Sequence, residues 1–309
     1  MNTQKNTIVA IDIAKMSLQI QIGKSAFELL NTPRGFDALI KRFVKLSKPL
    51  VICEASGGYE RALVRALHDA DVPVAVVNPA RVRAFAKSEG VHAKTDPIDA
   101  KMLLRFAKNK DLRLTERPDE AKEELSALMD RRNQVSATLT REKNRLEKEP
   151  LYTRKFIEES IDFLEKQLAD LDTCIAAIIE NDVALKSSVE AMKAVKGVGE
   201  VTAHAILAYL PDLTDISRGQ LVSLAGLAPF NRESGKTKIK AHIHGGRAKV
   251  RKCLYMAAQS AARFNDVIKE YVARLVAKGK PYKSALVAAM RKLLIHLQSL
   301  LKKQKLELV

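Results

Sequence analysis

Four acidic residues have types and positions that suit a divalent-cation site. Asp12 lies in the otherwise apolar run IVAIDI, where a charge is costly to bury without a partner, and Glu54 ends the apolar run LVIC. Asp96 and Asp99 are three residues apart, a spacing that places both on one face of a helix. Gathered carboxylates repel one another unless a cation binds, and Mg²⁺ prefers oxygen ligands. We therefore interpret the four as candidate metal ligands for phosphoryl transfer.

The pair in KTDPIDAK also has a simpler explanation. Asp96 followed by Pro97 is typical of a helix N-cap with proline at the first helical position, and Asp99 suits the helix dipole. Capping is the better explanation of this pair taken alone. Asp12 has no such explanation, so the metal interpretation depends on Asp12 and Glu54.

A candidate nucleophile, Ser234, stands beside the most basic segment of the chain. Between Lys236 and Lys252, seven of seventeen residues are Lys or Arg and two are His. Nearby cations would stabilise a serine alkoxide and the charge that develops on a phosphodiester. From chemistry alone the serine is more often an ordinary loop residue. The candidate nucleic-acid contacts here are Arg232, Lys236, Lys238, Lys240, His242, His244, Arg247, Lys249, Arg251 and Lys252. The two histidines suit phosphate contact or proton transfer.

The positive charge is concentrated at the C-terminal end. The 309 residues carry a formal net charge of +17. Residues 231–309 hold 19 Lys and Arg against 4 Asp and Glu, whereas residues 1–230 hold 34 against 32. Such asymmetry indicates a polyanionic partner, because Lys and Arg that neutralise phosphates release counterions. A membrane-surface helix would favour Trp, which is absent, so nucleic acid is the better interpretation.

Composition also argues against other classes of protein. No apolar run is long enough to cross a bilayer, and the N-terminus lacks the apolar core of a signal peptide. The cysteines, Cys53, Cys174 and Cys253, form neither a disulfide framework nor a metal-ligand pair. We expect a soluble, cytoplasmic protein with no membrane partner.

The carboxylates lie in a stretch that alternates strand-like and helix-like patterns. The strands are expected at residues 7–13, 17–23, 26–30, 50–55 and 72–78, and the helices at 33–46, 58–70, 79–89 and from Asp96 onward. Three strands followed by alternating helices and strands is the order of an RNase H-like α/β domain, which we place at residues 1–115. In that fold the first strand, the central strand and the last helix are neighbours, so the four carboxylates would converge.

The rest of the chain is expected to be helical. Residues 116–190 are rich in strong helix formers and predict two long helices, either an antiparallel hairpin or coiled coil, or part of an ordinary bundle. Residues 191–309 predict a mostly helical domain. Its KGVGE turn resembles a helix-hairpin-helix, in which Lys196, Gly197 and Gly199 would approach a phosphate, although such a turn is often only a turn.

Several motifs in the same order carry a family resemblance over almost the whole chain. They are VAIDIAK, CEASGGY, VNPARVRAFAKSEG, KTDPIDAKML, KGVGEVTA, AGLAPFNRESGK and GGRAKVRKCLYMAA. Together they resemble the bacterial insertion-sequence transposases with a DEDD motif and the related Piv-type site-specific DNA invertases. The resemblance implies a RuvC-like (RNase H-like) domain, a coiled coil and a C-terminal transposase domain.

The resemblance also implies site residues and partners. Asp12, Glu54, Asp96 and Asp99 would bind Mg²⁺, or Mn²⁺ in its place, and Ser234 would form a covalent phosphoserine intermediate with DNA. It further implies a noncoding guide RNA and a homodimer that assembles to a homotetramer in the cytoplasm, at the nucleoid. Three alternatives remain: a site-specific DNA invertase without an RNA guide, a RuvC-like nuclease of branched DNA that uses metal-activated water, and a non-catalytic nucleic-acid-binding protein.

Overall fold

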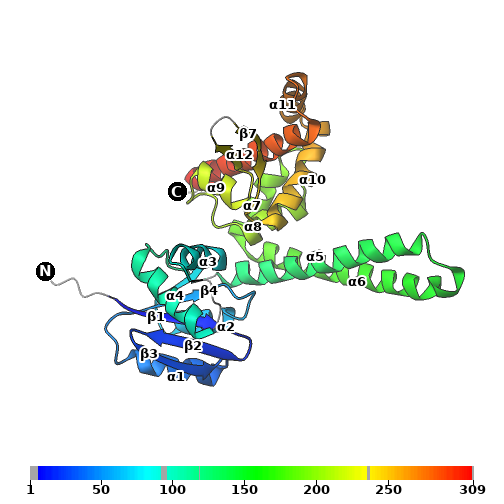
Figure 1. Ribbon diagram of the computed structural model, residues 1–309. Helices are drawn as coiled ribbons and strands as arrows, with labels where there is room; N and C mark the ends of the chain where they lie inside the picture. Colours follow the sequence, from blue (N-terminus) through cyan, green and yellow to red (C-terminus); the bar gives the residue numbers. More distant parts are fainter. Residues whose placement is uncertain (1–5, 92–95, 118, 235–236, 308–309) are drawn as a thin grey trace. The chain divides into compact units, whose positions relative to one another are not determined.

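The structure, a computed structural model, describes residues 6–91, 96–117, 119–234 and 237–307 (Figure 1). For residues 96–98, 231–234 and 237–241 it describes the backbone alone. The chain divides into two compact units, Met1–Arg117 and Pro118–Val309.

The first unit is built on a five-stranded sheet in the order β3-β2-β1-β4-β5. β1, β2 and β3 pair antiparallel, whereas β4 pairs parallel with both β1 and β5. Each strand lies within two residues of its predicted bounds, because alternating or continuous apolar runs are a strong strand signal. The strands are β1 Thr7–Ile13, β2 Ser17–Ile22, β3 Ser25–Leu30, β4 Pro49–Glu54 and β5 Val74–Val77.

Helices cover both faces of this sheet (Figure 1). They are α1 Pro33–Phe43, α2 Arg61–Asp69, α3 Pro79–Ser88 and α4 Asp96–Asn109. Alternate strand residues divide the core, as side chains on a strand point to opposite faces. Val9, Ile11 and Cys53 pack with α1 and α2, whereas Ala10 and Ile52 pack with α3 and α4.

Side-chain caps fix where two of these helices begin. The Thr32 hydroxyl accepts a hydrogen bond from the Gly35 N–H before α1, and the Asn78 carboxamide oxygen accepts one from the Ala80 N–H before α3. In both helices proline follows the cap, where its missing N–H leaves no intrahelical bond unmade. Both helices begin at the residue expected from the sequence, 33 and 79.

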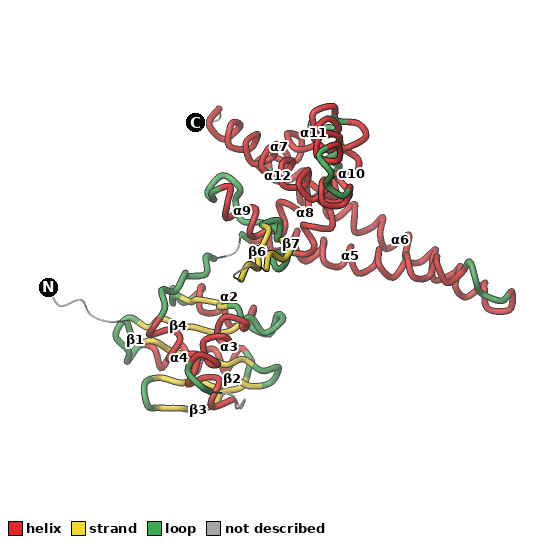
Figure 2. Tube along the Cα trace, turned by 45° about the horizontal axis from the view of Figure 1, so that its top comes forward, coloured by secondary structure: helices red, strands yellow, loops and turns green. Residues whose placement is uncertain are grey.

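The second unit begins with a long helical hairpin (Figure 2). α5 Glu120–Leu146 and α6 Leu151–Asn181 lie side by side, joined by a short connection at Pro150. Buried Leu139, Ile157 and Ile161 pack between them. The two predicted long helices are confirmed, while their supercoiling into a coiled coil stays a prediction.

The remaining elements pack around the base of that hairpin. They are α7 Val183–Lys193, α8 Glu200–Tyr209, α9 Arg218–Leu224, β6 Pro229–Ser234, β7 Thr237–Ile243, α10 Ala248–Phe264, α11 Asp266–Ala277 and α12 Tyr282–Glu307. One hydrophobic core joins α5 and α6 residues, such as Met129 and Ile175, to these helices. A separate segment at residues 116–190 therefore stays a prediction.

Two expectations differ from the structure in this unit. Ser234 was expected in a loop, but its backbone ends the strand β6, which pairs with β7. α12 is long and apolar enough to span a membrane by length and composition, contrary to the expectation for the chain. Half of its most apolar window is buried inside the unit, and the Gln298 amide there donates to the carbonyls of Leu213 and Ile216 at 2.8 Å. α12 is therefore described as a core helix.

Candidate catalytic site and nucleic-acid interface

Asp12 and Glu54 end two neighbouring parallel strands. The register of β1 and β4 runs from Thr7 beside Pro49 to Ile11 beside Cys53, so the next step sets Asp12 beside Glu54. Both side chains are half-buried. Because side chains alternate along a strand, both lie on the sheet face of Ala10 and Ile52, which is the face covered by α3 and α4. Two carboxylates are thus adjacent on one face of the sheet.

Asp99 is carried by the helix that packs on this same face. It is half-buried and lies one turn before Leu103, which is fully buried in the cluster that contains Ala10 and Ile52. Asp96 is the first residue of α4, one position inside the helix from the N-cap place that the capping interpretation gives it, and its side chain lies outside the described residues. The backbone therefore brings the helix start to the carboxylate-bearing face.

The carboxyl oxygens are the donors that a hard cation such as Mg²⁺ takes. Among the side chains that the structure describes, no group of three or more His, Cys, Asp or Glu is arranged to hold a metal ion. Asp12 and Glu54, which the strand register sets side by side, suit two ligands of one cation. The complete set with Asp96 and Asp99 stays a prediction.

The loop after β4 is organised by a carboxylate that the sequence analysis missed. Glu60 Oε2 accepts hydrogen bonds from Ser56 N at 3.0 Å, Ser56 Oγ at 2.8 Å and Gly58 N at 2.8 Å. Partial burial alone would raise the pKa of Glu60, but these hydrogen bonds together with its own backbone N–H lower it below the ordinary value. Glu60 therefore fixes the loop that follows Glu54. In the sequence, the segment ASGGYE places Glu60 a few residues after Ser56 and two glycines, which is the pattern that could have indicated this role.

Asn31 connects that loop to the turn after β1. Its Nδ2 donates to the carbonyl oxygens of Ala14, at 2.9 Å, and of Tyr59, at 3.3 Å. The carbonyls belong to the two segments that follow Asp12 and Glu54, so one amide links the carboxyl ends of the carboxylate-bearing strands. Nothing in the local sequence around Asn31 indicates this role.

The pKa of Cys53 is affected by the negative charge at the end of β4. Burial, and then the charges of Glu60 and Glu54, raise its pKa to about 12. The thiol is therefore protonated at neutral pH, and Cys53 is no nucleophile.

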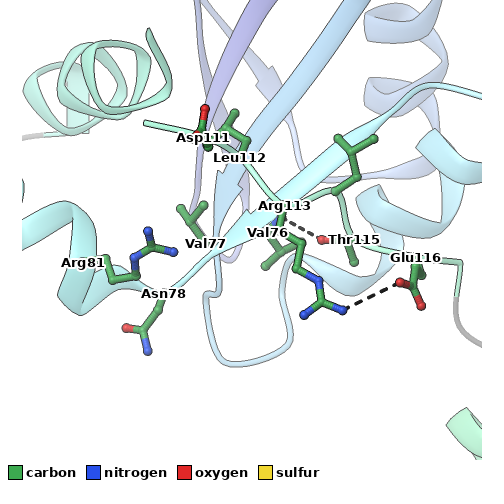
Figure 3. Close-up of a pocket in the computed structure, with 10 residues that line it drawn as sticks. Val76, Val77, Asn78, Arg81, Asp111, Leu112, Arg113, Thr115 and Glu116 are labelled. Carbon is green, nitrogen blue, oxygen red and sulfur yellow. Dashed lines mark hydrogen bonds and ion pairs between the residues drawn. The ribbon is translucent and has the colours of Figure 1, made fainter. Parts of the chain in front are cut away.

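A pocket of about 340 Å³ lies at the carboxyl end of β5, the strand beside β4 (Figure 3). One wall is the segment 111–116, which is tied to the sheet because Thr115 N donates to Val74 O at 2.7 Å and Thr115 Oγ1 accepts from Val76 N at 2.9 Å. Arg81 and Arg113 line the pocket, together with Val76, Val77, Asn78, Asp111, Leu112, Leu114, Thr115 and Glu116. Asp111 and Glu116 balance the two arginines, and Arg113 Nη2 forms an ion pair with Glu116 Oε1 at 3.9 Å (Figure 3).

In the second unit, Ser234 stands at the tip of the β6–β7 hairpin. Its backbone pairs with Thr237, and a register irregularity falls between Phe230 and Arg232. The side chains of Ser234, Arg232, Lys238 and Lys240 lie outside the described residues, as does the whole of Lys236. Their predicted roles stay predictions.

The other predicted contacts divide into exposed and engaged side chains. His242, His244, Arg247 and Lys252 are exposed. Arg251 Nη1 donates to Gly245 O at 2.5 Å and so braces the segment before α10.

Lys249 is engaged in a polar network between three helices. It forms an ion pair with Asp130 of α5 and lies 4.9 Å from the ring centroid of Tyr209. The Tyr209 hydroxyl donates to Asp130 Oδ1 at 2.6 Å and accepts from Asn133 Nδ2 at 3.1 Å. Burial, and then the hydrogen bond to Asp130, raise the pKa of Tyr209. Lys249 thus already holds α10 to the hairpin base, and its nucleic-acid contact stays a prediction.

The KGVGE turn places its two glycines in different environments. Gly197 has φ of 101°, and a Cβ there would lie 2.6 Å from Ala261 Cα, so glycine is required for packing against α10. Gly199 is the N-cap of α8 with open space around it and no side-chain cap. The Lys196 carbonyl accepts from Asn265 Nδ2 at 3.3 Å. The phosphate role of this turn stays a prediction.

Two family models match the chain. A DEDD-type IS110 model described as "Transposase" matches residues 9–149, and a model described as "Transposase IS116/IS110/IS902 family" matches residues 189–273. The first spans Asp12, Glu54, Asp96 and Asp99, and the second spans Ser234.

Curated relatives agree with these matches. The "Pilin gene-inverting protein" of Moraxella lacunata is 30% identical over 249 residues, which cover 79% of this chain and 77% of the relative. The protein of the same name from Moraxella bovis is 29% identical over 301 residues, 93% of each chain. The chain therefore belongs to the IS110 family of transposases and related site-specific DNA invertases, a family of DNA recombination proteins.

Proposed function

We propose that the protein cleaves and rejoins DNA strands through a covalent phosphoserine intermediate at Ser234, assisted by a metal site in the first unit. The observation that carries this proposal is the register of β1 and β4, which sets Asp12 beside Glu54 on the sheet face covered by α4. No capping role explains two adjacent carboxylates at the ends of buried strands. Membership of a family of DNA recombination proteins supports the substrate.

Asp12, Glu54, Asp96 and Asp99 are the proposed ligands. The first two adjoin in the sheet, and α4 brings the other two to the same face by its packing. A bound Mg²⁺, or Mn²⁺ in its place, would neutralise these carboxylates and supply positive charge at the phosphate oxygens. Asn31 and Glu60 hold the adjoining loops, so the strand ends keep their spacing.

The proposed chemistry is a transesterification at phosphorus. Ser234 Oγ forms a bond to the scissile phosphorus, and the bond from that phosphorus to a deoxyribose oxygen breaks. The serine proton passes to a carboxylate or to water, and the departing oxygen takes up a proton. The hydroxyl of the recipient strand then attacks the same phosphorus and releases Ser234 with its proton restored. The number of phosphoester bonds is unchanged, so rejoining needs no external energy source.

The first unit is proposed to be a RuvC-like, RNase H-like domain. Support comes from the strand order β3-β2-β1-β4-β5 and from the antiparallel pairing of the first three strands. It also comes from the helix that comes after β5 and α3 in the chain and packs on β1. That helix is α4, which carries the second pair of carboxylates.

The proposed partners are DNA and an element-encoded guide RNA in the cytoplasm, at the nucleoid. Residues 231–309 carry most of the net positive charge, and His242, His244, Arg247 and Lys252 are exposed within that part. RNA guidance predicts a noncoding RNA that copurifies with the protein and restores recombination when it is added back to RNA-free protein.

A homodimer that assembles to a homotetramer is proposed through the helical hairpin. Tyr152, Phe156 and Phe163 of α6 are 93%, 68% and 61% exposed, which is a large apolar surface for a helix pair. A second copy of this hairpin would cover them. Light scattering of the protein with and without DNA measures the mass of each assembly.

A second candidate function is site-specific inversion without a guide RNA. It is favoured by the printed names of both relatives, each a pilin gene-inverting protein. The substrate distinguishes the two: an invertase recombines two inverted sites on one DNA molecule with no RNA present, whereas the first proposal requires the RNA.

The test of the proposed chemistry is strand cleavage and joining on DNA that carries the ends of the element. Ser234→Ala should abolish both reactions, and Asp12→Asn should do the same. A RuvC-like nuclease that uses activated water would keep cutting after the serine change, and a non-catalytic DNA-binding protein would respond to neither. Either result would refute the phosphoserine proposal.

A further inference from the structure

An exposed aromatic stack lies at the base of the serine-bearing hairpin. Phe230 and His244 have ring centroids 3.9 Å apart and planes inclined by 26°. Phe230 lies in β6 across from His242, so His244 is its diagonal neighbour, within reach of a large side chain. Phe230 as a residue is 44% exposed and lies outside the core of the second unit.

The surroundings of this stack are those of a nucleic-acid surface. His242, Arg247 and Lys252 are exposed in the same segment, and the last quarter of the chain carries most of the positive charge. Exposed aromatic rings within a basic surface are the means by which proteins hold unpaired bases, because every base presents a flat face for stacking. A ring already stacked on a neighbour is held in one orientation.

We infer that the Phe230–His244 pair is a stacking platform for an unpaired base of the DNA strand whose phosphodiester reacts at Ser234. Phe230 and Ser234 lie on the same strand, about 13 Å apart at a rise of about 3.3 Å per residue. Stacked bases are spaced by about 3.4 Å, so the platform lies within about four base steps of the reacting phosphate. Opening a base there would separate the strands next to the cut. This inference rests on the proposed function.

The test compares two DNA duplexes of equal length, one fully paired and one with a single unpaired 2-aminopurine. Binding is measured by fluorescence anisotropy of an end label at one fixed salt concentration. Phe230→Ala should weaken binding of the unpaired duplex by about 5- to 100-fold and leave the paired duplex within about twofold. Phe230→Tyr should restore affinity, because a phenol ring also stacks. Phe264→Ala is the matched control, since Phe264 is 65% exposed on α10 outside the basic segment.

The 2-aminopurine emission gives a readout in the unmodified protein. Stacking on the platform should change the emission of the unpaired probe in the wild-type complex, and Phe230→Tyr should preserve that change. Equal loss of binding to both duplexes, or no loss for either, would overturn the inference. If the wild-type protein, assayed with its copurified RNA, bound neither DNA, the proposed function would fail with it. If the wild-type protein bound both and Phe230→Ala altered neither, the platform alone would be refuted.

Discussion

Replacing Asp12 with Asn should change both the stability of the first unit and its response to divalent cations. Neighbouring strands are about 4.8 Å apart, and the register sets Asp12 beside Glu54 on one face. Two negative charges at that spacing repel by about 1 kcal/mol in a water-like dielectric and about 3 kcal/mol at an effective dielectric constant of about 20. The half-buried side chains lie between these limits. These charges repel each other whatever other partners each has.

In EDTA, Asp12→Asn and Glu54→Gln should each remove about 1–3 kcal/mol of repulsion between these two carboxylates from the native state. A cation that binds the native state alone stabilises it by about 2.7 kcal/mol at a hundred times its dissociation constant. Wild-type protein should gain this increment in Mg²⁺ or Mn²⁺, and each variant should lose most of it.

Chemical denaturation followed by circular dichroism, with and without the cation, measures both quantities. Asp37→Asn is the matched control, because Asp37 is exposed on α1, on the opposite face of the sheet, and both quantities should stay as in the wild type. The reasoning is refuted if Asp12→Asn keeps the full cation increment, or if the control loses it equally.

Two predictions concern the second unit. Burial lowers the pKa of His204 despite the opposing charge of Glu200, so the unfolded chain binds more protons below about pH 6.5. Stability should therefore fall as pH drops from 7 to 5, and His204→Gln should flatten that fall in urea titrations; an unchanged slope would contradict it. Gly197→Ala should lower the free energy of unfolding by about 2–3 kcal/mol, because its Cβ would clash with Ala261, while Gly199→Ala should change it by no more than about 1 kcal/mol. Unfolding midpoints measure both changes, and equal losses would contradict the packing argument.

Much of the first unit was predictable because its signals are local. Apolar runs identified each strand, and helical patterns that begin at residues 33 and 79 identified the starts of α1 and α3. Asp12 stood out because a charge interrupts a buried strand, and Glu54 because it ends one. Their register could not be read from the sequence, since it depends on how β1 and β4 pair.

The features that were missed depend on contacts between distant segments. Asn31 and Glu60 act through loop carbonyls and amides that only the folded sheet brings near. From the sequence, Lys249 is one of several basic residues near the hairpin, and only the folded structure shows its ion pair with Asp130 of α5. The β6–β7 hairpin carries basic residues in place of a clear apolar alternation, so the strand that ends at Ser234 was interpreted as a loop.

The most direct test of the central claim is the identity of the residue that becomes attached to DNA. Protein should be trapped on DNA carrying the element ends, digested with protease and nuclease, and mapped by mass spectrometry. The proposal predicts a nucleotide phosphate on Ser234, present in the wild type and absent in Ser234→Ala and Asp12→Asn. An adduct on a different residue, or strand cleavage by wild-type protein with no protein–DNA adduct at all, would contradict it.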